Sequence, residues 1–182
     1  MEHAQQGERE FVTVMFVDVP GINVLADLLG LEESRQVIDP ILTLMFSEVP
    51  RYDGALLGFL GDGLVEVFRA AVGREDHAIR ALRSAQGMQQ ALAGYRHPLA
   101  SEHGIDLRGR IGLNTGAVIV DRIKILSRGR ENFSFDPMTN LAASLLNRAA
   151  PGQILVGAET ATAAGSAFAL RPLGEGIWTL QA

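Results

Sequence analysis

The stretch of sequence that decides the fold is residues 11–21, which read FVTVMFVDVPG. Its first seven residues are all β-branched, aromatic or apolar, which is typical of a buried β-strand. The strand should end at Asp18, because a proline and a glycine follow shortly after it. Beyond that turn we expect a helix that Asn23 caps and that continues to Leu28.

A second short segment, residues 59–63, reads FLGDG and joins two further apolar runs. We expect residues 55–60 and 64–68 to be the strands of a hairpin, since Asp-Gly between apolar runs is a strong hairpin signal. Asp62 then lies at the hairpin tip, beside Asp18 if the two strands are neighbours. Two carboxylates brought together in this way can hold magnesium ions that grip a triphosphate. Taken singly, each aspartate is explained as well by ordinary turn chemistry.

The order of elements around Asp18 also suits a phosphate group. A strand, an aspartate, a glycine turn and a helix start follow one another, and the amides at a helix N-terminus attract anions. Pro20 removes one of those amides, because proline has no backbone N–H. The backbone positions that we expect to bind phosphate are Val19, Gly21, Ile22 and Asn23.

Length and composition limit the function classes. The chain has 182 residues, which suits one domain with a sizeable core. A net charge of -5 disfavours a nucleic-acid partner, which usually needs a basic surface. Without cysteine there is no disulfide or thiolate metal site, and the four histidines, which lack metal-ligand spacing, are expected on the surface. No apolar stretch suits a membrane span or a signal peptide, so we expect a cytoplasmic domain with no membrane partner.

The rest of the chain alternates between helical and extended patterns. Apolar residues recur at helical spacing over residues 32–49, where Pro40 either kinks the helix or follows an Asp39 cap. Another long helix is expected over residues 74–95, before Pro98 and Gly104 break the chain. Shorter helices are expected over residues 138–149 and 159–164, and short strands over residues 154–156, 168–170 and 177–180.

A second hairpin is expected from residues 107–113 and 117–125, turned at the Asn-Thr-Gly of residues 114–116. Residues 122–132 carry four basic side chains and are expected to form a mobile loop. Strands and helices thus interleave with hairpins, which indicates an α/β or α+β fold with helices packed on one sheet.

Five motifs, taken in order, resemble the class III nucleotide cyclases, the catalytic domain of adenylate and guanylate cyclases. The resemblance extends from Glu10 to about Leu180. Ile22 departs mildly from it, because the family usually has phenylalanine at that position. The motifs are FVDVPG at residues 16–21, FLGDGL at 59–64, EDHA and AL within 75–82, RIGLNTG at 110–116, and NLAA and APGQILV within 140–156.

This resemblance implies a ferredoxin-like, antiparallel-rich sheet with helices packed on it. The domain would span residues 10–182, after a disordered or extended lead at residues 1–9. The resemblance also implies that Asp18 and Asp62 bind Mg²⁺ or Mn²⁺, in composite active sites between two domains paired head to tail. The ligand would be a nucleoside triphosphate, whose ribose 3′-oxygen attacks the α-phosphate to give a cyclic nucleotide for signalling and pyrophosphate. The second domain would be another copy of this chain or a different cyclase domain.

The facing domain in this family supplies a base-reading lysine, a second base-reading residue, an asparagine and a transition-state arginine. At the matching positions this chain has Gly58, Phe133, Asn140 and Ser144. Only the asparagine is retained. Serine cannot replace an arginine that is worth roughly 10³ to 10⁵ in rate. Arg148 lies one helical turn beyond Ser144 and is a possible substitute.

Three functions therefore remain open within the family. The chain is a working homodimeric cyclase with an unusual base pocket, a half-enzyme that needs a complementary partner, or a non-catalytic module that binds metal and nucleotide. Retention of both aspartates favours the last two, because random loss would strike them as often as the facing residues. A polymerase-palm or diguanylate-cyclase relative would leave the motifs at residues 110–116 and 140–156 unexplained.

Overall fold

The computed structural model describes residues 9–60, 63–70, 73–119 and 137–181. Within these residues seven strands form one sheet, in the order β2-β3-β1-β4-β5-β7-β6. Only β4 and β5 pair in parallel, so the sheet is mixed and mostly antiparallel, as predicted. The expected lead lies outside the described residues except for Arg9, which begins the first strand. The strands are β1 (Arg9–Asp18), β2 (Ala55–Leu60), β3 (Gly63–Arg69), β4 (Arg110–Ile119), β5 (Ile154–Gly157), β6 (Leu170–Gly174) and β7 (Ile177–Leu180).

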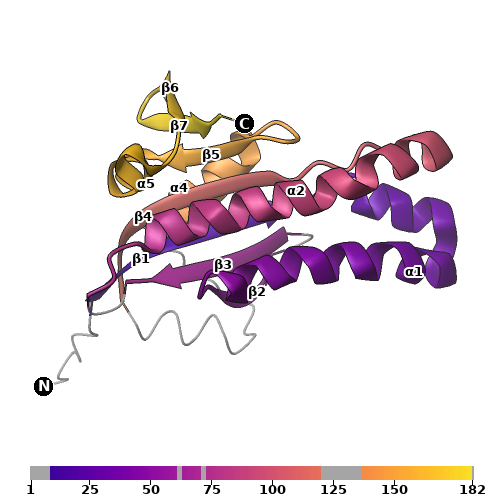
Figure 1. Cartoon of the computed structure of the whole chain (residues 1–182), viewed down its shortest axis with the longest axis horizontal. Helices are drawn as coiled ribbons and strands as arrows, with labels where there is room; N and C mark the ends of the chain where they lie inside the picture. Colours follow the sequence, from indigo (N-terminus) through magenta and orange to yellow (C-terminus); the bar gives the residue numbers. More distant parts are fainter. Residues whose placement is uncertain (1–8, 61–62, 71–72, 120–136, 182) are drawn as a thin grey trace, which may run out of the picture.

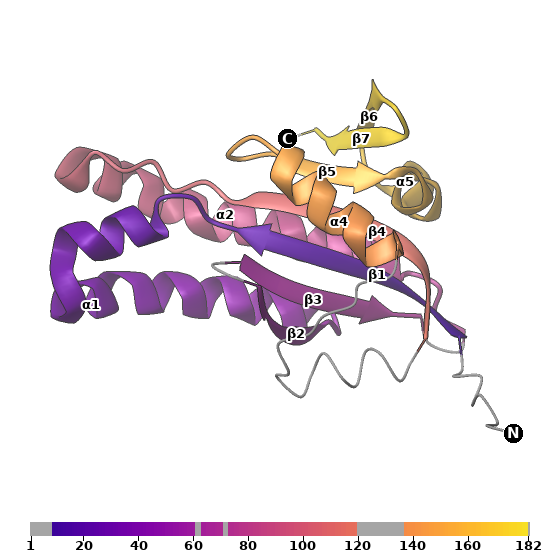
Figure 2. The ribbon, with the colours of Figure 1, turned by 180° about the vertical axis from the view of Figure 1, so that it is seen from behind.

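Helices cover both faces of this sheet (Figures 1 and 2). α1 (Ile22–Arg51) and α2 (His77–His103) pack against each other on one face. α4 (Pro137–Arg148) covers the opposite face and lies in front of β4 in Figure 2. α5 (Ala158–Ala164) contacts β4 and β5 and leads into a short 3-10 turn at Gly165–Ala167.

β1 runs through the middle of the sheet and contributes different side chains to its two faces, as alternation along a strand requires. Met15 and Val17 are buried in the core that α1 and α2 cover. Val12, Val14 and Phe16 are buried in a second cluster, which α4 covers. Burial on both faces explains why this strand is an almost continuous apolar run.

α1 contains both helices predicted from the sequence, and they join between the predicted end at Leu28 and the predicted start at residue 32. Gly30, with φ 73° and ψ 176°, is the non-helical position inside α1, and the bend is visible at the end of the helix pair in Figure 1. Glycine adopts a positive φ at little steric cost. Asp39 and Pro40 both lie inside the second segment, so the predicted cap at Asp39 is wrong, while the alternative of a kink at Pro40 stays a prediction. The helix continues past Pro40 because Ile38 and Ile41 on either side of it are buried in the core.

α2 is longer than its sequence pattern predicted. Pro98 was expected to break the chain, but the helix continues to His103 and ends at Gly104, whose φ is 69°. Leu99 is buried in the main core, and this packing offsets the helical hydrogen bond that the proline removes.

β4 replaces the predicted second hairpin, and this correction is the largest in the fold. Residues 110–119 form one strand, in which Asn114 pairs with Val14 and Thr115 with Thr13 of β1. Asn114 Nδ2 donates a hydrogen bond to the Met138 carbonyl at 3.0 Å, so it links β4 to the start of α4. The Asn-Thr-Gly sequence therefore serves packing rather than a turn. The expected basic loop at residues 122–132 lies outside the described residues.

His77 is a second correction, because it is buried rather than on the surface. Its Nδ1 lies 2.8 Å from Thr13 Oγ1, which in turn lies 2.8 Å from Thr115 Oγ1. Thr160 Oγ1 extends this chain of hydrogen bonds into α5, at 3.0 Å from Thr115. Burial, aided by the charge of Arg80, lowers the pKa of His77.

Candidate active site

Asp18 is the last residue of β1 and lies opposite Arg110, the first residue of β4. Arg110 Nη2 donates a hydrogen bond to Asp18 Oδ2, and the two side chains form an ion pair. Both side chains are largely buried, with 17% of Asp18 and 29% of Arg110 exposed. The register of two neighbouring strands therefore holds the predicted metal ligand beside a fixed positive charge.

A cavity of about 200 Å³ lies beside this ion pair. Gly63, the first residue of β3, lines it together with Asp18, because β3 neighbours β1 and Leu64 pairs with Val17. The condition set for Asp62 to lie beside Asp18, that the two strands are neighbours, is therefore met. Asp62 itself lies outside the described residues, so its role as a metal ligand stays a prediction. α4 supplies the rest of the wall through Ala143, Leu146 and Asn147.

A smaller cavity of about 110 Å³ lies at the start of α1, where Val19, Ile22 and Asn23 line it together with Asp18. These are three of the four predicted phosphate positions. Gly21 is the N-cap residue with φ 104°, so Asn23 lies inside the helix and its predicted capping role is wrong. No side chain caps this helix, and the Ile22 amide donates to the Val19 carbonyl at 3.2 Å. The Ile22 amide, one of the predicted phosphate donors, is therefore already hydrogen-bonded within the turn.

Among the described residues, the positions expected to act from the facing domain do not line either cavity beside Asp18. Gly58 lies on β2, an edge strand, at a register irregularity, and its φ is 156°. A Cβ placed there would have no neighbour within 4 Å. Asn140 and Ser144 are exposed on α4. Phe133 lies outside the described residues.

Arg148, the possible substitute for the missing arginine, is directed elsewhere. Its Nη2 lies 3.2 Å from Glu175 Oε2, in an exposed ion pair with the turn between β6 and β7. The residues that α4 presents to the Asp18 cavity do not include Arg148.

Two residues of this site were missed by reasoning from the sequence. Arg110 belongs to the RIGLNTG motif, but the strand expected there was residues 107–113, and only the register between β1 and β4 places Arg110 opposite Asp18. Asn147 also lines the cavity, seven residues after Asn140 and on the same side of α4. The seven-residue spacing from Asn140 is the sequence signal that could have indicated Asn147.

The donors present suit a hard divalent cation in kind, because magnesium and manganese prefer carboxylate oxygen. Asp18 supplies one such ligand next to a cavity. Across residues 9–60, 63–70, 73–119 and 137–181, no group of three or more His, Cys, Asp or Glu residues could hold an ion. A complete site would therefore also need Asp62 and groups from the nucleotide.

Residues 4–176 match the family described as Adenylate and Guanylate cyclase catalytic domain. This match covers nearly the whole chain. The chain belongs to this family. It is a nucleotide cyclase catalytic domain, and the resemblance inferred from its motifs is confirmed. Cyclases of this class use two metal ions.

Two proteins of Rhizobium meliloti (strain 1021) are similar to this cyclase domain in sequence. An uncharacterized protein is 26% identical over 167 residues, which is 90% of this chain and 16% of that protein. Adenylate cyclase 1 is 25% identical over 115 residues, which is 63% of this chain and 17% of that protein. The cyclase domain therefore spans about a sixth of the length of these curated relatives.

Solved structures of cyclases share the fold of this cyclase domain. The adenylyl cyclase CyaB from P. aeruginosa superposes with a TM-score of 0.79 at 22% identity, over 96% of this chain and 95% of that one. The guanylate cyclase domain of RhGC from Catenaria anguillulae, in complex with GTP, gives a TM-score of 0.71 at 20% identity, over 96% and 98%. Among the described helices of the cyclase domain, none is both long and apolar enough to cross a membrane.

Proposed function

We propose that this cyclase domain binds a nucleoside triphosphate with Mg²⁺ or Mn²⁺ at the Asp18 end of β1, and that as a homodimer it makes little or no cyclic nucleotide. The observation that carries the proposal is an asymmetry between two halves of one site. Asp18 lies at a cavity with a charged partner, whereas Gly58 and Ser144 replace the lysine and arginine that the family uses.

Binding of a triphosphate is supported by the environment of Arg110. Its Nε atom is buried and has no hydrogen-bond partner among the described residues. Its Nη2 donates to Asp18, at the wall of the same cavity. Because a guanidinium binds phosphate oxygens through several N–H groups, Arg110 can turn from the aspartate to a phosphate when a cation neutralises that carboxylate.

Asp18 and Asp62 would hold the cations. When bound, the cations supply activation of the ribose 3′-hydroxyl and neutralisation of phosphate charge. The start of α1 adds backbone amides near Asp18, whose partial positive charge favours the phosphates. These contacts orient the triphosphate, and they do not require the residues that this chain has lost.

Turnover would need more than this binding. Gly58 has no side chain with which to select a purine, and Ser144 carries no charge to stabilise the transition state. Arg148 is paired with Glu175 and does not line the cavity. Loss of an arginine in phosphoryl transfer alone costs roughly 10³- to 10⁵-fold in rate.

Pairing with a second domain is part of the proposal. The guanylyl cyclase domain of the RhoGC fusion protein from Blastocladiella emersonii forms a non-canonical dimer in one solved structure and is monomeric in another. A half-enzyme would be active when a different cyclase domain supplies the lysine and the arginine. A regulatory module would bind nucleotide in the same way but form no product with any partner.

Product formation tests the proposal. The purified chain is incubated with Mn²⁺ and each of ATP, GTP, CTP and UTP, and cyclic product is measured by chromatography. We expect little or no product from the wild type, and more from Ser144→Arg than from the uncharged control Ser144→Gln. Robust turnover by the wild type that Asp62→Asn abolishes would contradict the proposal.

A mixing experiment separates the half-enzyme from the regulatory module. The partner is a cyclase domain that keeps its base-reading lysine and its arginine but has both metal aspartates replaced. Product that appears only in the mixture, and that requires Asp18 of this chain, identifies a half-enzyme. No product from the mixture identifies a regulatory module.

A further inference from the structure

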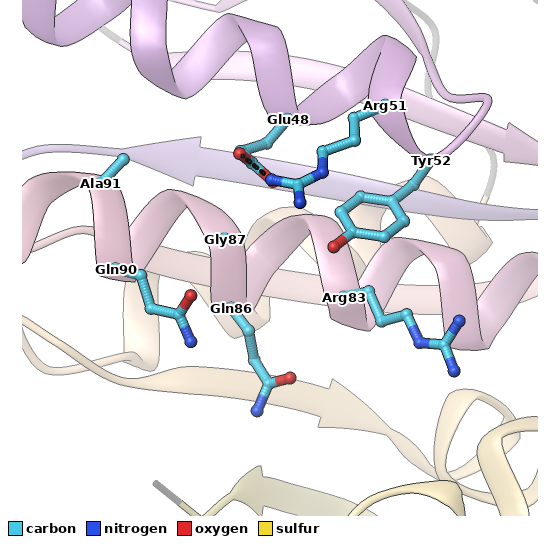
Figure 3. A pocket seen from close by; sticks show the side chains of 8 residues that line it. All are labelled: Glu48, Arg51, Tyr52, Arg83, Gln86, Gly87, Gln90 and Ala91. Atoms are coloured by element: carbon cyan, nitrogen blue, oxygen red, sulfur yellow. Dashed lines mark hydrogen bonds and ion pairs between the residues drawn. The ribbon is translucent and has the colours of Figure 1, made fainter.

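A pocket of about 370 Å³ lies between the last turns of α1 and the middle of α2 (Figure 3). It shares no lining residue with the two cavities beside Asp18. Gly87 and Ala91 of α2 also line it, and the Glu48 carboxylate packs directly over Gly87. The polar residues that surround it are Glu48, Arg51, Tyr52, Arg83, Gln86 and Gln90.

Arg51 lies at the edge of this pocket, with 66% of its side chain exposed. Its Nη1 donates to Glu48 Oε1 at 3.1 Å, and its guanidinium lies 5.7 Å from the centre of the Tyr52 ring (Figure 3). Glu48 is itself buried against α2, where a Cβ on Gly87 would collide with its carboxylate. These two contacts restrict the orientations of the Arg51 side chain while its remaining donors stay accessible, and such preorganisation lowers the cost of binding a ligand.

The charge and the hydrogen-bonding groups of the pocket favour an anion. Arg51 and Arg83 give two positive charges against one negative charge on Glu48, in a chain whose net charge is -5. Among the described residues Arg83 has no ion-pair partner, and its side chain is exposed. Gln86 and Gln90 add amide N–H donors along α2, and Tyr52 adds a hydroxyl.

The volume of the pocket further limits the class of ligand. A pocket of about 370 Å³ lies within the usual range for small-molecule sites and is larger than a single phosphate ion needs. Guanidinium groups bind phosphate through paired N–H bonds, while the glutamine amides and the tyrosine suit a polar organic group. We propose that this pocket is a binding site for a small phosphate ester, separate from the Asp18 site and independent of the function proposed for that site.

Calorimetric titration tests this proposal on the whole chain in EDTA, which removes any metal-dependent binding at Asp18. The probes are glycerol 3-phosphate, inorganic phosphate and citrate. We expect saturable binding of both phosphate compounds, with the ester tighter than the inorganic ion. Arg51→Ala and Arg83→Gln should each weaken this binding at least tenfold, while Arg35→Ala, an exposed arginine elsewhere on α1, should leave it unchanged.

The two arginine variants guard against a folding artefact. Arg51→Ala leaves buried Glu48 without its partner and can disturb the helix, whereas Arg83→Gln removes an exposed charge with no partner among the described residues. The loss in Arg83→Gln therefore carries the test, with circular dichroism as the check on folding. Absence of saturable binding, equal binding by wild type and Arg83→Gln, or tighter binding of citrate than of either phosphate compound would each overturn the proposal.

Discussion

Arg110 donates a hydrogen bond to Asp18 across the boundary between β4 and β1, so the carboxylate expected to bind a cation already has a positive partner. This pair neutralises the end of β1 when no ligand is present. A cation that binds Asp18 competes with the guanidinium, while a triphosphate offers the guanidinium new acceptors. Loss of Arg110 should therefore raise the affinity of the domain for free metal and lower its affinity for metal with nucleotide.

Arg110→Gln is expected to bind Mn²⁺ alone roughly five- to tenfold more tightly, since the competing charge is removed. The same variant should bind Mn²⁺ with a non-hydrolysable triphosphate roughly 10- to 100-fold more weakly, since charge-assisted hydrogen bonds to phosphate are lost. Titration calorimetry measures both affinities. The control is Arg108→Gln, which removes an exposed arginine paired with Asp106. If the affinity for Mn²⁺ alone and the affinity for Mn²⁺ with the triphosphate change equally and in the same direction in Arg110→Gln, this account of the pair is contradicted.

Glu66 is fully buried on β3, and both of its carboxyl oxygens lack a hydrogen-bond partner among the described residues. Burial raises the pKa of Glu66 from 4.5 to about 8. A raised folded pKa contributes stability below pH 4.5 that is lost as pH rises toward 8. Glu66→Gln should therefore stabilise the domain by about 3 kcal/mol at pH 7 and by little at pH 4. Denaturant unfolding at the two pH values measures the difference, and equal effects at both would refute the prediction.

Arg80 joins the start of α2 to three backbone carbonyls. Its guanidinium donates to the carbonyl oxygens of Tyr52 at 3.1 Å, Asp53 at 3.2 Å and Arg69, and it pairs with Asp76. Only 7% of this side chain is exposed.

Replacement of Arg80 by methionine removes the donor that these three carbonyls share, which should cost about 3 kcal/mol in the free energy of unfolding at about 1 kcal/mol for each hydrogen bond. Arg74→Met provides the matched control, because Arg74 also pairs with Asp76 but is exposed. Thermal and denaturant unfolding should show little change in the control. Similar losses in the two variants would mean that the carbonyl contacts contribute little.

Gly112 of β4 lies directly beneath α4. A Cβ at this position would collide with backbone atoms of Ala142, Leu145 and Leu146. Gly112→Ala should therefore destabilise the domain by roughly 1–3 kcal/mol. Gly94 lies in α2 with open space around it, so Gly94→Ala should stabilise by roughly 0.5–1 kcal/mol. Opposite shifts in melting temperature are expected, and a neutral Gly112→Ala would contradict the close approach of α4 to β4.

Sequence patterns predicted the elements whose signals are local. β1 and the β2–β3 hairpin follow from apolar runs and an Asp-Gly pair, and α4 and α5 from helical spacing. The motifs added the family, and with it the type of sheet. These predictions succeeded because the spacing of apolar residues within each segment matches the side of the strand or helix that is buried.

Errors arose where contacts distant in sequence override a local signal. Asn114, Thr115 and Gly116 look like a turn, but each pairs with a residue of β1. His77 looks like a surface residue, but its hydrogen bond to Thr13 joins residues 64 positions apart. Pro40 looks like a break, but the core on either side of it keeps the helix intact. None of these contacts can be inferred from composition over a short window.

The candidate site was predictable in part. Asp18 at the end of β1 and the hairpin that neighbours it follow from apolar patterns and from the family motifs. Arg110 and Asn147 were missed, because the register between β1 and β4 and the angle of α4 decide which side chains meet Asp18. Asp62 and Phe133 lie outside the described residues, so their roles remain predictions.

The most direct test of the central claim is Mn²⁺ binding with a non-hydrolysable triphosphate, measured by electron paramagnetic resonance. We predict saturable binding by the wild type, its loss in both Asp18→Asn and Asp62→Asn, and no loss in Asp106→Asn, which changes an exposed carboxylate. If all four proteins bind the ion with equal affinity, the two aspartates are turn residues only and the proposed function is wrong.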